Sequence, residues 1–466
     1  MRSECMIFDR NKNLFINLSA CAAIIWIILV YSHALIFSSK ILFSTDFYKF
    51  YQSALFYFEG ISIYGKIVRP LTPAEVAFMH GTILVLSSDL NPPFFTLLLL
   101  PTAWLTYTQS FLVWSALSLI ATIAGILISF KPYPALWNNL NLRLWGLVGF
   151  LLYFPSYANL RFGQVTSFLL LLTAGAWLAS RKQKNYLAGF LLGIALSIKA
   201  FYGLFLIYFA VRKQWRLLFS FCATYIACTA ISIVIFGVSA YKTYYLTLTK
   251  ILWYSASWNG SILGFLTRLF GGDNEGNIPI FHLPFLTHPL FLISAGLLTL
   301  YLIWSTWHSM RLNNTLSAEA KLDHFDWGFS LTIVLMILIA PLGWLYYFSL
   351  LIIPFITILR ISDKLSSFNM NLTLMSLILL LSSMPGNYQR PESVIQTPMI
   401  LTWASYYFYA LALLFVLLAL LRNQMLNPKY QPTNYSIHHK FSPVIQLILY
   451  LLAAIPSIIT FGIAMS

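Results

Sequence analysis

The chain has 466 residues, of which 59% are hydrophobic and only 9% are Asp, Glu, Lys or Arg, and its mean hydropathy is +0.78. Soluble domains carry roughly 25% charged residues, so this composition excludes an ordinary soluble protein and predicts one integral membrane domain over residues 1–466, embedded in a lipid bilayer. The net charge of +15 comes from basic residues that punctuate apolar runs, so we predict no nucleic-acid partner.

The first apolar run, residues 14–38, contains no charged residue and predicts a membrane helix. It lacks a cleavage site of the A-x-A type, so we expect it to be retained. Further apolar runs lie at 93–130, 144–158, 164–180, 186–211, 215–236, 286–307, 327–341, 343–360, 370–385, 398–421 and 442–464. We therefore predict an all-α polytopic membrane protein with about 13 (range about 11–14) transmembrane helices, of which those in 370–466 are additional C-terminal helices.

Basic clusters set the predicted orientation. With the N-terminus inside, the clusters 181–184 and 212–216 are both expected inside, because basic residues favour that side. The run 187–211 must then enter the membrane and return as two short helices, with Lys199 near the turn. In the run 93–130, Pro101 and the polar stretch 106–110 leave open whether there is one crossing or two.

Residues 40–92 form a long first outer loop, and loops of this length are usually functional. Within it, apolar residues recur at helical spacing and predict an amphipathic helix lying in the outer interface. Ser44 or Thr45 is expected to cap its start and Gly60 its end. The expected apolar face consists of Phe47, Phe50, Tyr51, Ala54, Leu55 and Phe58.

Two acids of this loop are candidates for chemistry. Asp46 opens the amphipathic helix, where a carboxylate would favour the helix dipole or, alternatively, act as a general base. Asp89 precedes Asn91-Pro92-Pro93 and is the second-choice acid. On sequence alone the structural and the catalytic interpretation of Asp46 are equally supported.

Three cations are candidates for binding a phosphate that arrives on a lipid. Lys199 interrupts an apolar run with no neighbouring acid, and an unpaired ionisable residue within a membrane is a functional candidate by default. Arg161 lies between two apolar runs, where it serves either as an interfacial anchor or as a ligand for the phosphate. Arg268 follows Asn259-Gly260-Ser261 and is the third of these cations.

Aromatic and amide side chains on the same side are candidates for sugar or acceptor binding, although interfacial aromatic belts explain most such residues equally well. These candidates are Tyr48, Gln164, Asn259, Trp344 and Tyr347. Neither His308 nor His324 pairs with Cys or carboxylates at ligand spacing, so we predict no metal. No Walker loop is present in the sequence, and we predict no cofactor.

A series of short motifs runs through residues 40–350. In chain order they are Asp46-Phe47-Tyr48, Gly60-Ile61-Ser62-Ile63-Tyr64, Asn91-Pro92-Pro93-Phe94, Pro101, Trp114, Gly163-Gln164, Ala188-Gly189, Ile198-Lys199, Arg212-Lys213-Gln214-Trp215-Arg216, Asn259-Gly260-Ser261 with Arg268, and Pro341-Leu342-Gly343-Trp344. Together they resemble the polyprenyl-phosphate-sugar-dependent transferases of the GT-C superfamily. The closest likeness is to glycosyltransferase family 87, a group that contains bacterial mannolipid mannosyltransferases.

The resemblance implies that residues 40–350 form a GT-C-like catalytic region in which Asp46, in the first outer loop, is the catalytic base. Lys199 matches the Lys of an Ile-Lys-Pro pattern, although Ala200 replaces the Pro. Tyr346 and Tyr347 stand where members tend to carry His, and Gly260 stands where Gln is usual.

The chemistry expected from these residues is transfer of a hexose, with mannose favoured by the family, from a polyprenyl-phosphate sugar to a glycolipid or cell-envelope glycan. One base suffices, because the lipid phosphate is already a good leaving group, whereas a glycosidase would need a second carboxyl group as acid. Asp46 would activate the acceptor hydroxyl for inverting attack, and Lys199, Arg161 and Arg268 would stabilise the departing phosphate.

Two other function classes remain open. A lipid or solute transporter or flippase would use Lys199 to bind substrate in passing, but it would show an internal repeat of broken helices. An O-antigen-type polymerase or ligase would depend more on outer Arg and His. The expected location is the bacterial inner membrane with the site facing the periplasm or exterior, and the sequence leaves the oligomeric state open.

Overall fold

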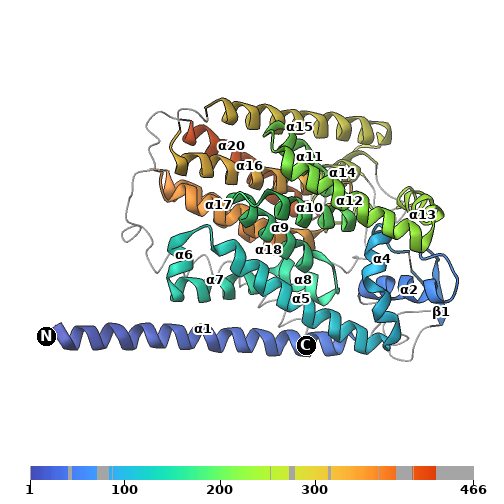
Figure 1. Cartoon of the computed structure of the whole chain (residues 1–466), viewed down its shortest axis with the longest axis horizontal. Helices are drawn as coiled ribbons and strands as arrows, with labels where there is room; N and C mark the ends of the chain where they lie inside the picture. Colours follow the sequence, from blue (N-terminus) through green and yellow to red (C-terminus); the bar gives the residue numbers. More distant parts are fainter. Residues whose placement is uncertain are drawn as a thin grey trace.

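The computed structural model describes residues 2–39, 45–70, 83–86, 88–251, 253–271, 279–312, 316–365, 367–384, 401 and 404–426. The predicted crossing at 442–464 lies outside these residues. Within them the chain forms a bundle of helices with a single small sheet (Figure 1).

The first part of the chain contains α1 (Arg2–Ser38), α2 (Phe47–Phe58), β1 (Ile67–Pro70), β2 (Ile83–Leu86), α4 (Pro93–Leu99), η2 (Leu100–Trp104), α5 (Tyr107–Phe130), α6 (Pro134–Asn138), α7 (Leu140–Leu152), α8 (Phe154–Arg161), α9 (Thr166–Arg181), α10 (Asn185–Ile198), η3 (Ala200–Gly203) and α11 (Leu204–Val211). The second part contains α12 (Trp215–Phe236), α13 (Val238–Leu248), α14 (Ile262–Leu266), η4 (Thr267–Gly271), η5 (Pro284–Leu286), α15 (Thr287–Arg311), α16 (Ala318–Leu338), η7 (Leu345–Leu351), α17 (Ile352–Ser362), α18 (Phe368–Ser383) and α20 (Tyr406–Met425).

Six helical segments of the described chain are long and apolar enough to span a bilayer. They are Leu14–Ser38, Tyr107–Phe130, Trp215–Phe236, Pro284–Arg311, Leu345–Ser362 and Tyr406–Met425. Shorter apolar helices such as Asn185–Ile198 and Phe368–Ser383 accompany them. The predicted all-α polytopic membrane fold is therefore confirmed, while the count of about 13 crossings stays a prediction.

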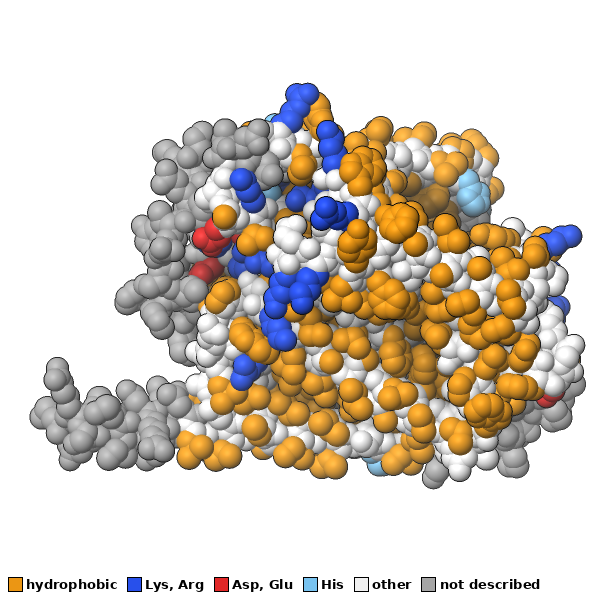
Figure 2. All heavy atoms as spheres, in the orientation of Figure 1, with side chains coloured by type: hydrophobic (Ala, Val, Ile, Leu, Met, Phe, Trp, Pro, Cys, Tyr) orange, Lys and Arg blue, Asp and Glu red, His pale blue; other side chains and the backbone are white. Residues whose placement is uncertain are grey.

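The surface matches this assignment. Figure 2 shows hydrophobic side chains covering most of the middle of one face, while Lys and Arg gather toward one side of it. Large apolar side chains on α12 and α15, such as Phe219, Val234 and Leu292, are more than half exposed. Side chains of this kind are stable in contact with hydrocarbon chains, because burying them in lipid removes apolar area from water.

The predicted division of residues 187–211 into two short helices that turn back near Lys199 is confirmed, and the packing of α10 on α12 shows the reversal. Gly189 faces Leu217 and Phe221, and Gly193 faces Phe221 and Thr224, so the two helices run in the same direction. A Cβ atom on Gly189 would lie 2.3 Å from the carbonyl oxygen of Leu217, which shows how closely the backbones approach.

Residues 185 and 215 consequently lie at the same end, and α11 has to run back from Lys199. We call the end that carries residues 181–184 and 212–216 the basic end, and the opposite end the Lys199 end.

The run 93–130 is divided at η2, and Thr106 and Gln109 form a capping box at the start of α5.

The predicted helix of the first loop forms as α2, but its start differs from expectation. Asp46 is the N-cap residue in place of Ser44 or Thr45, and its carboxylate makes no capping hydrogen bond. The end is as predicted, because Gly60 has φ +71° and the amide of Ile61 donates to the carbonyl of Phe56, which is the Schellman arrangement.

Most of the predicted apolar face of α2 packs against protein, while Phe58 at its end is 53% exposed; its expected position in the outer interface stays a prediction. The ring of Phe47 stacks on Trp114 of α5 at 5.5 Å, and Phe50 meets Phe95 of α4 edge-on at 5.0 Å. Residues between α2 and α4 also form an antiparallel pair of strands, β1 and β2, with Ile67 opposite Leu86. These two strands were not predicted from the sequence.

Candidate functional site

Four segments bring charged and phenolic groups together at the Lys199 end. Asp46 begins α2, Asp89 precedes α4, Lys199 ends α10, and Tyr347 lies in η7. Lys199 interacts electrostatically with both Asp46 and Asp89, and so does the Tyr347 hydroxyl. The ammonium of Lys199 lies 5.5 Å from the centroid of the Tyr347 ring. The first- and second-choice acids of the sequence analysis therefore face the same lysine.

Asp46 is held by two hydrogen bonds and remains accessible. Lys49 donates to one carboxylate oxygen at 3.0 Å, and the amide of Gln164 donates to the other at 2.7 Å. The Asp46 side chain is 29% exposed. A carboxylate bonded in this way is fixed in orientation, and each oxygen retains lone pairs that can accept another proton donor. The Asp46 side chain therefore does not act as a hydrogen-bonding helix cap, and its carboxylate is both oriented and accessible.

The turn that carries Gln164 is fixed to the start of α2. The amide of Phe47 donates to the carbonyl of Phe162 at 3.1 Å, and the indole of Trp114 donates to the carbonyl of Gly163 at 2.8 Å. Gly163 has φ +65°, and a Cβ atom on it would lie 2.6 Å from the Cβ of Phe47. Only glycine fits there without strain, so the Gly163-Gln164 pair places the amide on Asp46.

Asp89 is a different kind of carboxylate, because it is only 1% exposed. One oxygen accepts from the backbone and side-chain nitrogens of Asn91 at 3.0 and 2.6 Å, while the other is buried without a hydrogen-bond partner among the described residues. Burial raises the pKa of Asp89 to about 6, against the opposing effects of Lys199 and the Asn91 hydrogen bonds. Asn91 thus serves to hold Asp89, and Pro93 begins α4 behind it.

The three predicted phosphate-binding cations lie in different surroundings. Lys199 is at the centre of the site. Arg161 ends α8 on the same turn as Gln164, is partly exposed, and stands 5.9 Å from the ring of Phe162. Arg268 is 4% exposed, and its guanidinium donates to the Ser405 hydroxyl and to backbone carbonyls, including that of Ala256 at 2.9 Å. No contact in the described chain joins Arg268 to Lys199, so its phosphate role stays a prediction.

The two aromatic–polar motifs are one structural unit. Asn259 pairs with Trp344 in an antiparallel bridge, and Gly260 donates its amide to the carbonyl of Gly343 at 2.9 Å. The side-chain amide of Asn259 donates to the carbonyl of Pro341 at 3.1 Å and accepts from the amide of Gly343 at 2.9 Å. Because Asn259 is fully buried and these bonds occupy its amide, it holds the two loops together.

The remaining candidates are aromatic and largely buried. Tyr48 is 3% exposed, and its hydroxyl accepts from Gln52 at 3.2 Å. Trp344 and Tyr347 are 5% and 3% exposed. Tyr347 faces the site through Lys199, while Trp344 packs on Trp258 with ring centroids 6.1 Å apart. Of these three, Tyr347 therefore has the most direct connection to the charged centre.

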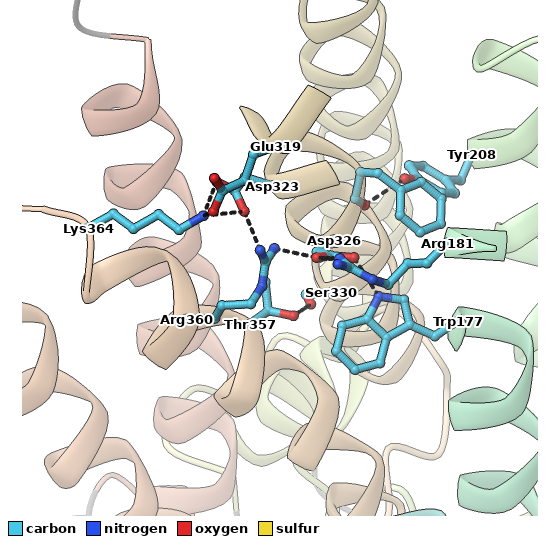
Figure 3. Close-up of polar contacts among 11 residues, drawn as sticks. Trp177, Arg181, Tyr208, Glu319, Asp323, Asp326, Ser330, Thr357, Arg360 and Lys364 are labelled. Carbon is cyan, nitrogen blue, oxygen red and sulfur yellow. Dashed lines mark hydrogen bonds and ion pairs between the residues drawn. The ribbon is translucent and has the colours of Figure 1, made fainter. Parts of the chain in front are cut away.

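A second polar group was not predicted from the sequence (Figure 3). Asp326 of α16 accepts from the Trp177 indole at 2.8 Å and pairs with Arg181 and Arg360, and Asp323 pairs with Lys364 at 2.9 Å. The network also includes an Arg360–Asp323 pair and a Lys364–Glu319 pair. We call these six charged residues the ion network.

The ion network ties α9, α16 and α17 at the basic end. Its three acids and three bases are charge-balanced, which is the condition under which buried charges are tolerated, and we interpret the network as structural. A signal existed, because Glu319, Asp323 and Asp326 share one helical face and Arg360 and Lys364 another. Among the described residues, no group of three His, Cys, Asp or Glu side chains could hold a metal ion.

Comparison with known proteins identifies the chain. A comparison with curated proteins found no match. The model of glycosyltransferase family 87 matches residues 90–322, which is half of the chain. The matched range begins directly after Asp89, includes Arg161, Gln164 and Lys199, and leaves Asp46 outside. The protein is thus a polytopic membrane glycosyltransferase, and the chain belongs to glycosyltransferase family 87.

Proposed function

We propose that this glycosyltransferase moves a hexose, with mannose as the first choice, from a polyprenyl-phosphate donor to a glycolipid or cell-envelope glycan acceptor. The observation that carries the proposal is the position of Asp46, which is partly exposed, held by Lys49 and Gln164, and in electrostatic contact with Lys199. A fixed base beside a cation is what attack by a hydroxyl and departure of a phosphate require.

Asp46 is the general base of the proposed reaction. It accepts the proton of the acceptor hydroxyl while that oxygen attacks the anomeric carbon of the donor. The bond from this carbon to the phosphate oxygen breaks, and its electron pair leaves with the lipid phosphate. Attack opposite to the leaving group inverts the anomeric configuration. Asp89 is less suited to this role because it is buried and committed to Asn91.

Lys199 stabilises the leaving phosphate. Within the described chain its ammonium has no ion pair or hydrogen bond, and it lies 5.5 Å from the centroid of the Tyr347 ring. An ammonium without an ion-pair partner gains more free energy on binding an anion than a lysine that is already paired. Arg161, on the turn that presents Gln164, is the second cation of the phosphate site, and Arg268 supports the loops around Asn259.

We further propose that the site faces the periplasm or exterior of a bacterial inner membrane. The support is the positive-inside bias, because residues 181–184 and 212–216 lie at the end opposite Lys199. A donor whose sugar is presented on the outer leaflet would reach Asp46 and Lys199 without crossing the bundle.

The test is transfer by the purified, full-length protein with a synthetic polyprenyl-phosphate mannose and extracted glycolipids. Asp46→Asn should lower the transfer rate on the order of 10²–10⁴-fold, because it keeps the shape and removes the base. Glu59→Gln, at the exposed end of the same helix, is the matched control and should retain the rate. Full activity of the Asp46 variant would refute its role, whereas transfer from nucleotide sugars alone would refute the donor class.

A further inference from the structure

Four nitrogen-bearing side chains meet at the basic end, outside both the proposed active site and the ion network. Arg212 is the C-cap residue of α11, and His308, His324 and Arg422 belong to α15, α16 and α20. The charges of Arg422, Arg212 and His308 all act on His324, and the Trp304 ring lies 4.4 Å from the Arg422 guanidinium and 5.9 Å from the His308 ring. We call them the cationic cluster.

Several nitrogens of the cationic cluster are buried without a partner in the described chain. They are Nε of Arg212, Nδ1 of His308, both ring nitrogens of His324, and Nε and one terminal nitrogen of Arg422. Arg422 and His324 are only 2% and 3% exposed. A buried guanidinium with unmet donors is costly, since neither water nor a counterion compensates for its lost hydration.

The neighbouring carboxylates do not balance this charge. The carboxylate that acts on His324 is Asp323, which is already paired with Arg360 and Lys364. In the part of the chain that the structure describes, neither Arg422 nor Arg212 forms an ion pair. The ion network is therefore neutral, while the cationic cluster beside it carries the full charge of two arginines.

Aromatic rings line the cationic cluster. The Arg422 guanidinium lies 4.4 Å from the centroid of Trp304 and 5.9 Å from that of Trp327, and the Arg212 guanidinium lies 5.0 Å from that of Phe325. These contacts offset part of the desolvation cost but leave Nε of both arginines and one terminal nitrogen of Arg422 without a partner in the described chain. Trp304 is 49% exposed, so one half-exposed ring covers Arg422 on that side.

We propose that the cationic cluster is a phosphate-binding site, distinct from the proposed donor site and about 20 Å from it along α16. The distance follows from the rise of about 1.5 Å per residue between His324 and the end of the helix near Trp344. A phosphate supplies several acceptor oxygens and the negative charge that the two guanidinium groups lack. Its source is either free phosphate or the head group of an anionic lipid that enters beside Trp304.

The experiment measures the unfolding midpoint, Tm, of the full-length protein in a sugar-based detergent that contains no phosphate. Inorganic phosphate is titrated in one arm, and short-chain phosphatidylglycerol is titrated in the other, at constant ionic strength. The variants are Arg422→Met and Arg212→Met. Arg311→Met is the matched control, because Arg311 also stacks on a tryptophan, Trp307, at 3.6 Å, but is exposed.

We expect a saturable rise of Tm in the wild type and in Arg311→Met, and a tenfold or larger increase in the half-saturating concentration in the other two variants. Without ligand, Arg422→Met should unfold at or above the wild-type Tm, because it removes an unpaired buried charge. A response to phosphate alone assigns a free anion, a response to the lipid alone assigns a head group, and a response to both assigns the phosphate group as such. The proposal is overturned if neither ligand raises Tm, or if Arg422→Met and Arg212→Met keep the wild-type response.

Discussion

Replacing Asp89 by Asn should change how the stability of this protein depends on pH. In the folded protein, burial raises the pKa of Asp89 from its ordinary value of 3.8 to about 6. The folded state therefore keeps this proton between pH 4 and 6 while the unfolded state has lost it. Folding stability must fall as the pH rises through this window, because the native state binds more protons than the unfolded state.

The magnitude follows from the same values. Each factor of ten in an ionisation equilibrium is worth about 1.4 kcal/mol, so the ionised Asp89 destabilises the fold at pH 7 by about 3 kcal/mol relative to pH below 4. This free energy is not reduced by solvent screening, because Asp89 is only 1% exposed. Asp89→Asn lacks the ionisation, and its stability relative to wild type should rise by this amount across the window.

The assay is chemical or thermal unfolding of the detergent-solubilised protein at intervals from pH 4 to pH 8. The difference between Asp89→Asn and wild type should grow from its value at pH 4 and level off above pH 7. Glu59→Gln, which removes an exposed carboxylate from the same loop, should show no such growth. Parallel pH profiles of the Asp89 variant and wild type would refute the reasoning, whatever their absolute offset.

Three further predictions follow from other contacts. Lys199→Met should lower kcat/KM for the polyprenyl-phosphate sugar on the order of 10²–10³-fold in the transfer assay, and Lys242→Met, on exposed α13, should not. Asn259→Leu should cost at least about 3 kcal/mol in unfolding measurements, because it leaves the buried backbone amides of Gly343 and Ser261 without their acceptor. Asp326→Asn should cost about 3–5 kcal/mol by leaving two arginines short of charge, so a value near that of an exposed pair, under about 1 kcal/mol, would contradict the buried ion network.

The fold class and part of the candidate site could be predicted from local sequence patterns. Apolar length, basic clusters and Gly60 predicted the membrane helices, the return at Lys199 and the end of α2, because each is decided by neighbouring residues. The contact between Asp46 and Gln164 could also have been predicted, since both residues belong to motifs that the family resemblance groups together.

What the sequence did not predict depends on contacts between distant segments. The bridge between Asn259 and Trp344 joins residues more than eighty positions apart, and an amide that holds two loops looks the same in the sequence as one that binds a sugar. Asp326 likewise reads as an ordinary polar residue until α9 and α17 bring Arg181 and Arg360 to it. The burial of the α2 face was missed because helical periodicity gives the face but not what covers it.

The close approach of α10 to α12 has a consequence for how the charged centre is kept in place. Gly189 and Gly193 leave no slack between the two helices, and Lys199 is the residue at which α10 stops. Lys199 stands at the C-terminal end of α10, where the negative end of the helix dipole favours a positive charge. A side chain at either glycine would tilt α10 and carry Lys199 away from Asp46. A natural variant with a bulkier residue at Gly189 or Gly193, both far from any reacting atom, would therefore first show itself as a loss of catalytic activity.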